Sequence, residues 1–371
     1  MRNRLDLAAL VLVTALVASG CNSPHPAAEP DPTESRPTLA AASATPSATR
    51  RPSDTPTMAA SPTSTPTGLV SLVAVGDIML GRTVGEQVLA KGPQVVFAGV
   101  QPILNAADIR IGNLECALTD TGSPEPKKTF TLKAPPAAAE ALRLGKFDLL
   151  SLANNHSMDY GYAGLRAAQK NLARVNIATV GAGADFTEAH APVILQRNGL
   201  RLAFLGYMDV PEERDGFDAR DWIAAAARPG VAWADPSEIA ADVTAAKSKA
   251  DLVIVLLHSG TEIGDYQSVL SGAQLEAAHA AIDAGAALVV GSHPHQLESI
   301  ERYHGGLIAF SLGNFVFDDY RGVANATILL QVTLDRNGVQ GYKYVPALIQ
   351  NGLPQVVPPE RVPVIGTLVA P

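Results

Sequence analysis

The 371-residue sequence has only two cysteines, Cys21 and Cys116, so no disulfide framework is expected in the folded part. Aromatic residues make up 5% of the chain, and 28 basic residues face 36 acidic ones, for a net charge of −8. The sequence has no basic stripe, which argues against a nucleic-acid partner. What is present is a length sufficient for one large domain or two ordinary ones, and a 47% share of hydrophobic residues that can supply a core.

The first 21 residues have the features of an export signal. Arg2 and Arg4 precede an apolar stretch over residues 7–17, which is too short to span a bilayer comfortably and is followed by small residues and Cys21. This pattern resembles the bacterial lipoprotein signal, in which the cysteine becomes the lipidated first residue. We therefore expect a lipoprotein signal peptide over residues 1–21 and an extracytoplasmic protein, anchored to the cell membrane through lipid on Cys21. An ordinary cleaved signal peptide is the alternative.

Residues 22–68 form a low-complexity segment. They hold ten of the 27 prolines, mixed with Ser, Thr and Ala, and have almost no large apolar residues. Such a composition cannot bury enough surface to fold, which predicts a disordered tether. We expect one folded domain over residues 69–358 and a short C-terminal tail over residues 359–371.

From residue 69 onward, apolar runs alternate with segments of good helix formers, a pattern that predicts an α/β domain with a buried sheet. A turn at Asn337-Gly338 predicts a closing hairpin of residues 324–335 and 338–348. We expect two packed sheets with helices outside, and an insertion near the site at 211–236. The expected strands are 69–75, 109–112, 149–152, 178–180, 192–196, 201–206, 252–257, 288–290, 299–303 and 306–311; the expected helices are 94–106, 136–144, 164–173, 236–248 and 272–284.

Polar side chains directly follow five of the apolar runs. Strands rich in Val, Ile and Leu are typically buried on both faces of a sheet, and their ends gather along one edge, where α/β proteins build their sites. Carboxylates, amides and imidazoles that meet there form a ligand set for divalent metal, with capacity for two ions. The residues are Asp77, Asn113, Glu115, Asn154, Asn155, His156, His258, His293 and His295.

Each of these residues alone also has a structural interpretation. His258 could be a hydrogen-bonded histidine at a strand end, and Asp77 could cap the next turn. Glu115 could belong to a turn like a capping box, or could bridge two cations. One of the two amides, Asn154 or Asn155, could have a purely structural role and hold its loop by hydrogen bonds to the backbone.

The motifs together resemble the capsule-synthesis CapA family, linked to poly-γ-glutamate capsules, within the calcineurin-like metallophosphoesterase superfamily. The matching stretches run in the family's order over residues 73–318. The resemblance implies a four-layer α/β/β/α sandwich with a metal site at the strand ends. The stretches are VAVGDIMLGR, IGNLECALT, LLSLANNHSMDYG, VLLHSGTEI, GSHPHQLESIE and FSLGNFVFD.

The resemblance also implies roles for individual residues. It makes His156 the general acid, with Asp159 as a candidate to fix its tautomer. Met79 stands where the superfamily has a histidine ligand, which leaves open one or two divalent ions per chain (Mn, Fe, Zn or Mg). The implied metal ligands are Asp77, Glu115, Asn155, His258, His293 and His295; Asn113, Asn154, Asn314 and Arg82 are candidates to support a ligand or contact substrate. For Asn314 the alternative is a loop amide bonded to backbone, and for Arg82 a solvated loop charge.

Two functions from different classes follow. One is a metal-dependent hydrolase of phosphoesterase type, exported and acting in biosynthesis of a capsule or envelope polymer, with a phosphoester or amide as substrate. The other is a non-catalytic accessory protein that binds or guides an anionic polymer during export, within a capsule-synthesis complex. A protein with a net negative charge needs a local cluster of basic residues to bind such a polymer. Lys127, Lys128 and Lys133 are the visible cluster, and the alternative is that they belong to a solvated loop.

Overall fold

The computed structural model describes residues 68–213, 216–262, 269–318 and 322–362. The expected signal peptide, nearly all of the expected tether and most of the expected tail lie outside these residues. The described residues belong to one folded unit. None of the helices in these ranges combines the length and the hydrophobicity needed to cross a bilayer.

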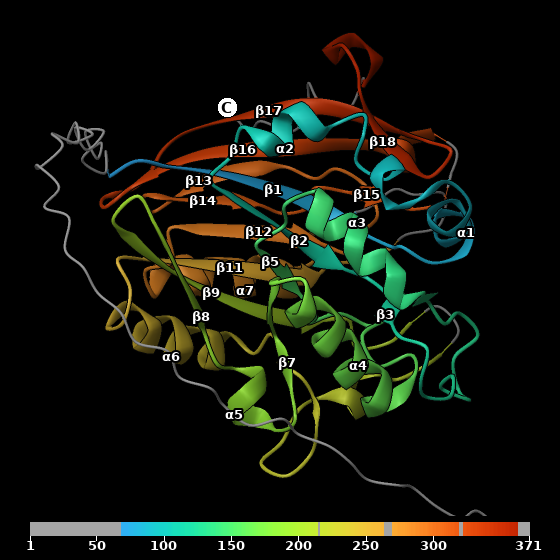
Figure 1. The fold of residues 1–371 in the computed structure, drawn as a ribbon. Coiled ribbons are helices and arrows are strands. Elements are labelled where there is room, and N and C mark those ends of the chain that lie inside the picture. The colour runs from blue at the N-terminus through green and yellow to red at the C-terminus, as the bar shows by residue number, and fades with distance from the viewer. Residues whose placement is uncertain (1–67, 214–215, 263–268, 319–321, 363–371) are drawn as a thin grey trace, which may run out of the picture. The chain divides into compact units, whose positions relative to one another are not determined.

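Two large sheets are stacked on each other within the described residues (Figure 1). The first has eight strands, in the order β18-β17-β16-β1-β2-β5-β6, with β15 also beside β1. The second has six, in the order β13-β14-β12-β11-β9-β8. The first comprises β1 (Val70–Ile78), β2 (Ile109–Leu114), β5 (Leu149–Ser151), β6 (Ala178–Val180), β15 (Asn314–Val316), β16 (Ala326–Asp335), β17 (Gly338–Gln350) and β18 (Leu353–Val356); the second comprises β8 (Val193–Arg197), β9 (Leu200–Asp209), β11 (Leu252–Ser259), β12 (Leu288–Ser292), β13 (Ile300–Tyr303) and β14 (Gly306–Ala309).

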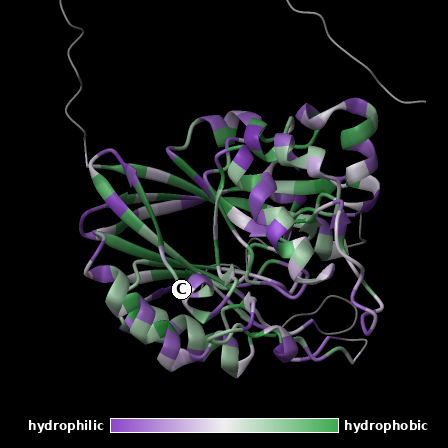
Figure 2. Cartoon of the chain, turned by 60° about the horizontal axis from the view of Figure 1, so that its bottom comes forward, coloured by the Kyte–Doolittle hydropathy of each residue, from purple (hydrophilic) through white to green (hydrophobic). Residues whose placement is uncertain are grey.

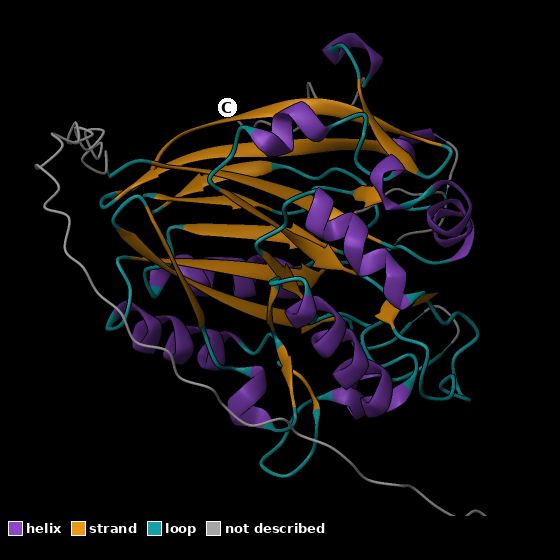
Figure 3. Cartoon of the chain, viewed as in Figure 1, coloured by secondary structure: helices purple, strands orange, loops and turns teal. Residues whose placement is uncertain are grey.

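Helices cover the outer faces of both sheets, as the purple and orange layers of Figure 3 show. Helices α6 and α7 pack on the second sheet, and α1, α3 and α4 contribute to the core on the first. Two small strand pairs, β3–β4 and β7–β10, lie outside the large sheets. The helices are α1 (Arg82–Lys91), α2 (Gln101–Asn105), α3 (Ala139–Leu144), α4 (Gly161–Arg174), α5 (Phe186–Ala189), α6 (Pro236–Lys247) and α7 (Gly272–Asp283), and the short strands are β3 (Ala117–Leu118), β4 (Lys133–Ala134), β7 (Ala182–Gly183) and β10 (Gly230–Val231).

The apolar strands fit this architecture because their side chains alternate between two buried layers. In β11, Ile254 and Leu256 belong to the core between the sheets, whereas Val253 and Val255 belong to the core under α6 and α7. Hydrophobic residues accordingly run along the strands, and hydrophilic ones lie on the outer helices (Figure 2). The expected four-layer α/β/β/α sandwich is confirmed.

The structure corrects the expected helix at 94–106. A short 3₁₀ turn (Pro93–Val95) and the five-residue α2 replace it, with Pro102 in the first turn of α2. Proline lacks the N–H that a continuous helix would need at that position, so the helix begins there. Helix α1 was not expected, since only Val84, Gly85 and Val88 on it are buried and its apolar pattern is weak. The expected hairpin is confirmed as β16 and β17, paired from Asp335↔Gly338 onward.

Parallel pairing brings the polar strand ends to one edge. Asp77 in β1 is in register with Asn113 in β2 and with Asn314 in β15. In the second sheet, His258 in β11 is in register with Ser292 in β12. The carboxyl ends of parallel strands point the same way, so both sheets deliver polar side chains to the same place.

Candidate metal centre

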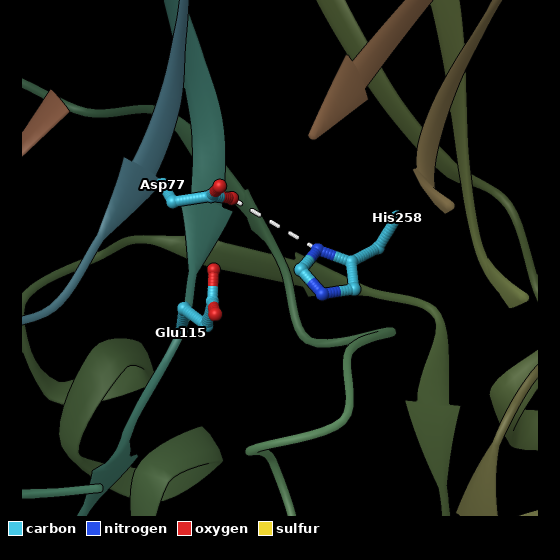
Figure 4. A group of neighbouring side chains, drawn as sticks. All are labelled: Asp77, Glu115 and His258. Atoms are coloured by element: carbon cyan, nitrogen blue, oxygen red, sulfur yellow. Dashed lines mark ion pairs between the residues drawn. The ribbon is translucent and has the colours of Figure 1, made fainter. Parts of the chain in front are cut away.

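Three buried side chains from three segments form the centre of the site. Asp77 lies near the end of β1, Glu115 directly after β2, and His258 in β11, and each is at most 1% exposed. One ligand atom from each lies within 4.8 Å of the others. Figure 4 shows them converging, with Asp77 Oδ1 and His258 Nδ1 3.9 Å apart. Two carboxylates and an imidazole in this arrangement can hold a divalent cation.

The loop after β12 places two more imidazoles at this centre. The backbone N–H of His293 donates a hydrogen bond to Asp77 Oδ2 at 3.2 Å, and the His293 ring lies 4.8 Å from that of His258. His295 Nδ1 lies 3.5 Å from Asp77 Oδ2. Both loop histidines have left-handed backbone conformations, with φ of 103° and 58°. Such conformations are uncommon outside glycine and cluster at functional sites.

Two buried polar atoms at this centre show that its residues fit a cation. Within the described residues, Glu115 Oε1 and His293 Nδ1 are buried and have no hydrogen-bond partner. A buried polar atom left unpaired costs about 1–3 kcal/mol. Both atoms are Lewis bases, so a bound cation would satisfy them where the protein's own donors do not.

Amides hold the ligand candidates in place. Asn113 Nδ2 lies 2.8 Å from Asp77 Oδ1 and 3.3 Å from Glu115 Oε2, and its own Oδ1 accepts a hydrogen bond from Asn154 Nδ2 at 2.9 Å. Asn314 Oδ1 lies 2.9 Å from His295 Nδ1. All three amides are buried. Contacts of this kind fix the orientation of metal-binding side chains.

His258 has a partner at each ring nitrogen. Its Nε2 lies 2.9 Å from Asn155 Oδ1, and its Nδ1 lies 2.9 Å from Ser292 Oγ. Asn155 is 4% exposed and lies in the loop after β5, so a third loop reaches the centre. The structure therefore brings all six expected ligand residues together.

A chain of charged groups leads from His156 into the interior. His156 Nδ1 lies 2.7 Å from Asp159 Oδ2, and Lys128 Nζ lies 2.6 Å from Asp159 Oδ1 and 2.7 Å from Glu213 Oε1. His156 Nε2 faces the centre, 4.0 Å from Glu115 Oε1. Lys128 is therefore no solvated loop residue, whereas Lys127 and Lys133 are exposed. Its side chain is fully buried, with Nζ near two aromatic rings.

Burial and mutual charge shift the pKa values of the central groups in opposite directions. Burial, assisted by the charge of Asp77, raises the pKa of Glu115 well above its usual range. Burial opposes ionisation of Asp77 as well, but the hydrogen bond from His295 and nearby imidazoles keep its pKa below the usual range. Burial lowers the pKa of His258 and lowers that of His293 to about 4, so both are neutral and able to bind metal at pH 7. For His295, burial lowers the pKa, but Glu115 and other carboxylates raise it more.

A cavity of about 590 Å³ opens onto the centre. His156, His293 and His295 face it, and Arg82 lies on its wall, where it pairs with Asp318 at 3.3 Å. Met79 instead lies in the hydrophobic core, and its Sδ accepts a hydrogen bond from the Gly81 N–H at 3.1 Å. The lining residues are Arg82, Phe130, Leu132, Asn155, His156, Val210, Pro211, Glu212, Glu213, Gly260, Thr261, Glu262, His293, His295 and Phe317.

Three contacting residues were not among the expected site residues. Glu213 accepts from Asn155 Nδ2 at 3.2 Å, Ser292 contacts His258, and Glu262 Oε1 lies 3.2 Å from His295 Nε2. Glu213 belongs to segment 211–236, which does reach the site, but Phe217 and Trp222 of that segment are part of the hydrophobic core and not of a peripheral insertion. Ser292 and Glu262 lie inside the motif stretches quoted above, and this position in the sequence was the signal that could have identified them as site residues.

Comparison with known proteins gives a consistent result. Residues 71–319 match the family described as bacterial capsule synthesis protein PGA_cap. The chain is 36% identical to the "PGA biosynthesis protein CapA" of Bacillus subtilis, covering 78% of this chain and 74% of that protein. It is also 36% identical to the "Capsule biosynthesis protein CapA" of Bacillus anthracis, covering 78% and 69%. A "Probable polyglutamine synthesis accessory protein" of Mycobacterium tuberculosis is 34% identical, covering 59% and 57%.

Proposed function

Because this chain belongs to the family of bacterial capsule synthesis proteins PGA_cap, we propose that it acts in making an anionic envelope polymer of the poly-γ-glutamate type and carries a metal-dependent hydrolase site. The observation that carries the hydrolase part is a pair of buried ligand atoms, Glu115 Oε1 and His293 Nδ1, that have no hydrogen-bond partner among the described residues. They lie beside a histidine, His156, that is oriented by a carboxylate. The first feature calls for a cation, and the second supplies a proton donor.

The residues that would hold one or two divalent ions come from five segments. When bound, such ions lower the pKa of a water molecule and polarise a phosphoryl or carbonyl oxygen of the substrate. Asn113, Asn154 and Asn314 hold the ligands in place. The ligands are Asp77, Glu115, Asn155, His258, His293 and His295.

His156 is the group that handles the proton. Asp159 accepts from its Nδ1, so the proton transferred is the one on Nε2, the nitrogen that faces the centre and the cavity. Protonation of the leaving oxygen or nitrogen by a positioned histidine typically accelerates a reaction by 10²–10⁴-fold. Arg82 on the cavity wall would bind an anionic oxygen of the substrate.

The location of this activity is part of the proposal. The charged start, the apolar stretch and Cys21 support export and lipid anchoring, and the proline-rich segment supports a tether between membrane and folded domain. The site would then meet the polymer outside the cytoplasm, within a capsule-synthesis complex.

A second function, binding or guiding an anionic polymer without cleavage, is favoured by Met79. Met79 is buried in the core, so it leaves the site one imidazole short of the superfamily pattern. Glu212, Glu213 and Glu262 line the cavity and repel an anionic chain unless cations are bound. In this case the metal is a bridge to the polymer, and His156 is dispensable.

Metal content and hydrolysis of the purified protein decide between the two functions. We expect elemental analysis to find divalent metal that is lost in His258→Ala and His293→Ala. We expect an aryl phosphodiester or poly-γ-glutamate to be cleaved with added Mn²⁺, and His156→Ala to keep metal but lose turnover by about 10²-fold or more. His279→Ala, on α7 away from the site, is the control. Bound metal with metal-dependent polymer binding and no cleavage would establish the second function; unchanged metal content in both histidine variants would refute the site.

A further inference from the structure

Met79 stands where the superfamily has a histidine ligand, so the metal centre has one imidazole donor fewer than that pattern. His295 lies on the side of the centre where a replacement donor is within reach. Asn314 Nδ2 faces the backbone carbonyls of His295 and Ala324, each at 3.4 Å, so Asn314 Oδ1 is turned toward the His295 ring. Oδ1 can only accept, so its 2.9 Å contact places the ring hydrogen on His295 Nδ1. When a metal displaces the other ring proton, the lone pair of the imidazole is therefore on Nε2, and Nε2 is the atom that can bind a cation.

Two carboxylate oxygens face that nitrogen. Glu115 Oε1 lies 3.6 Å from His295 Nε2, and Glu262 Oε1 lies 3.2 Å from it. Bonds from such donors to a divalent metal are about 2.0–2.2 Å long, so donor atoms that share one ion lie roughly 3 Å apart. Each of the two carboxylate oxygens is therefore close enough to His295 Nε2 to share an ion with it.

Packing of the loop after β11 fixes the approach of Glu262. Gly260 has a φ of +123°, and a Cβ on it would lie 2.7 Å from Pro294 Cγ. Gly260 therefore lies directly against Pro294, and only glycine allows both this backbone conformation and this contact. This close approach places Glu262, two residues further on, beside His295.

We propose that Glu262 is a metal ligand, which shares with Glu115 and His295 an ion on this side of the site and supplies the donor that Met79 does not. This inference rests on the proposed metal function. The fully buried Glu115 Oε1, which has no hydrogen-bond partner within the described residues, points independently to a cation at the same place. Glu262 is 26% exposed on the cavity side, so it closes the shell toward the cavity.

A carboxylate in place of an imidazole also changes the metal that the site prefers. Oxygen ligands suit Mn²⁺ and Mg²⁺, whereas imidazoles suit Zn²⁺ more. With Glu262 as ligand, the shell at this position contains the carboxylates of Glu115 and Glu262 with one imidazole, that of His295. We therefore expect preference for Mn²⁺ over Zn²⁺ to depend on residue 262.

Metal titration of the full-length protein tests the assignment without any activity assay. After removal of metal by chelation, free Mn²⁺ is followed by electron paramagnetic resonance, and Zn²⁺ by competition. We expect Glu262→Gln to weaken Mn²⁺ binding about 10- to 100-fold or more, because loss of even a supporting group has that effect at a metal site. Glu262→His should retain binding and shift the preference toward Zn²⁺.

The control is Glu212→Gln, which removes the same charge from an exposed position on the same cavity and should leave Mn²⁺ binding unchanged. Glu262→Gln is isosteric and on a loop, and its thermal unfolding in chelator verifies that it folds. If Glu262→Gln binds Mn²⁺ like the unaltered protein while His258→Ala does not, Glu262 only forms an ion pair with His295 and this inference fails alone. If the unaltered protein binds neither Mn²⁺ nor Zn²⁺, the proposed metal function fails with it.

Discussion

Lys128 is the residue whose role changes most between sequence and structure. Its side chain is fully inaccessible and bridges Asp159 and Glu213, and its Nζ also donates to the Asn155 carbonyl at 2.6 Å. One cation thus ties the loop that carries Asn155, His156 and Asp159 to Glu213 of segment 211–236. In the sequence, Lys128 is one of three lysines near a motif, and nothing local distinguishes it from exposed Lys127.

At the residue scale we predict that Lys128→Met destabilises the fold by about 3–5 kcal/mol. Removing one partner of a buried ion pair leaves the other charge uncompensated, here two carboxylates. Denaturant unfolding of the protein measures the change. Lys127→Met is the matched control, because Lys127 is 73% exposed in its side chain, and its effect should stay within about 0.5 kcal/mol. Equal unfolding midpoints for the two variants would show that the buried bridge contributes nothing.

At the element scale, the site depends on how closely strands approach one another at its edge. A Cβ on Gly76 in β1 would lie 1.7 Å from the Gly313 carbonyl oxygen, which accepts a hydrogen bond from the Asp77 N–H at 3.0 Å. This contact joins β1 to the segment that leads into β15, and so fixes Asp77 relative to Asn314. Strand β1, which carries the ligand candidate Asp77, can approach Gly313 this closely because residue 76 is a glycine.

We accordingly predict that Gly76→Ala costs at least about 1–3 kcal/mol of stability, since overpacking forces backbone shifts, and that it also lowers metal content. Gly341→Ala in β17 of the same sheet is the control, because a Cβ there would meet no atom within 4 Å. Unfolding midpoints and elemental analysis of both variants provide the measurement. Wild-type metal content in Gly76→Ala would mean that this strand contact does not position the ligands.

Elements also show where local patterns are insufficient. Most strands of the two large sheets were predicted within a few residues, because burial on both faces leaves an uninterrupted apolar run. The short strands β15 and β18 of the first sheet were not predicted. The helix expected at 94–106 was wrong because Pro102 and the packing of Val96 and Phe97 into the core override the good helix formers around them. Helix α1 was not predicted, because only three of its residues are buried and its sequence therefore has little apolar periodicity.

At the scale of the whole molecule, the two sheets and the metal centre form one thermodynamic unit. The ligand candidates come from strands and loops of both sheets, so an ion bound to them would link the two halves of the sandwich. Without metal, the same place holds buried carboxylates and, within the described residues, polar atoms that have no hydrogen-bond partner. Metal binding and global stability should therefore be coupled.

We predict that a divalent metal at 100 times its dissociation constant stabilises the protein by about 2.7 kcal/mol for each ion bound only in the folded state. Thermal unfolding with excess Mn²⁺ and with chelator measures the difference. His258→Ala should show little or none of it, whereas His279→Ala should show all of it. Unfolding that is the same with Mn²⁺ and with chelator, in protein shown to bind the ion, would contradict this coupling.

The sequence by itself determined the strand order along the chain, the layered α/β class, the family and the positions of the six ligand candidates. These features are local, because an apolar run and the polar residue that ends it are adjacent in the chain. Only the tertiary structure decided that Lys128 is buried, that Glu213 reaches Asn155, and that Glu262 faces His295. Those contacts join residues that are distant in the chain or lie on loops, and loop approach depends on packing that no short-range pattern encodes.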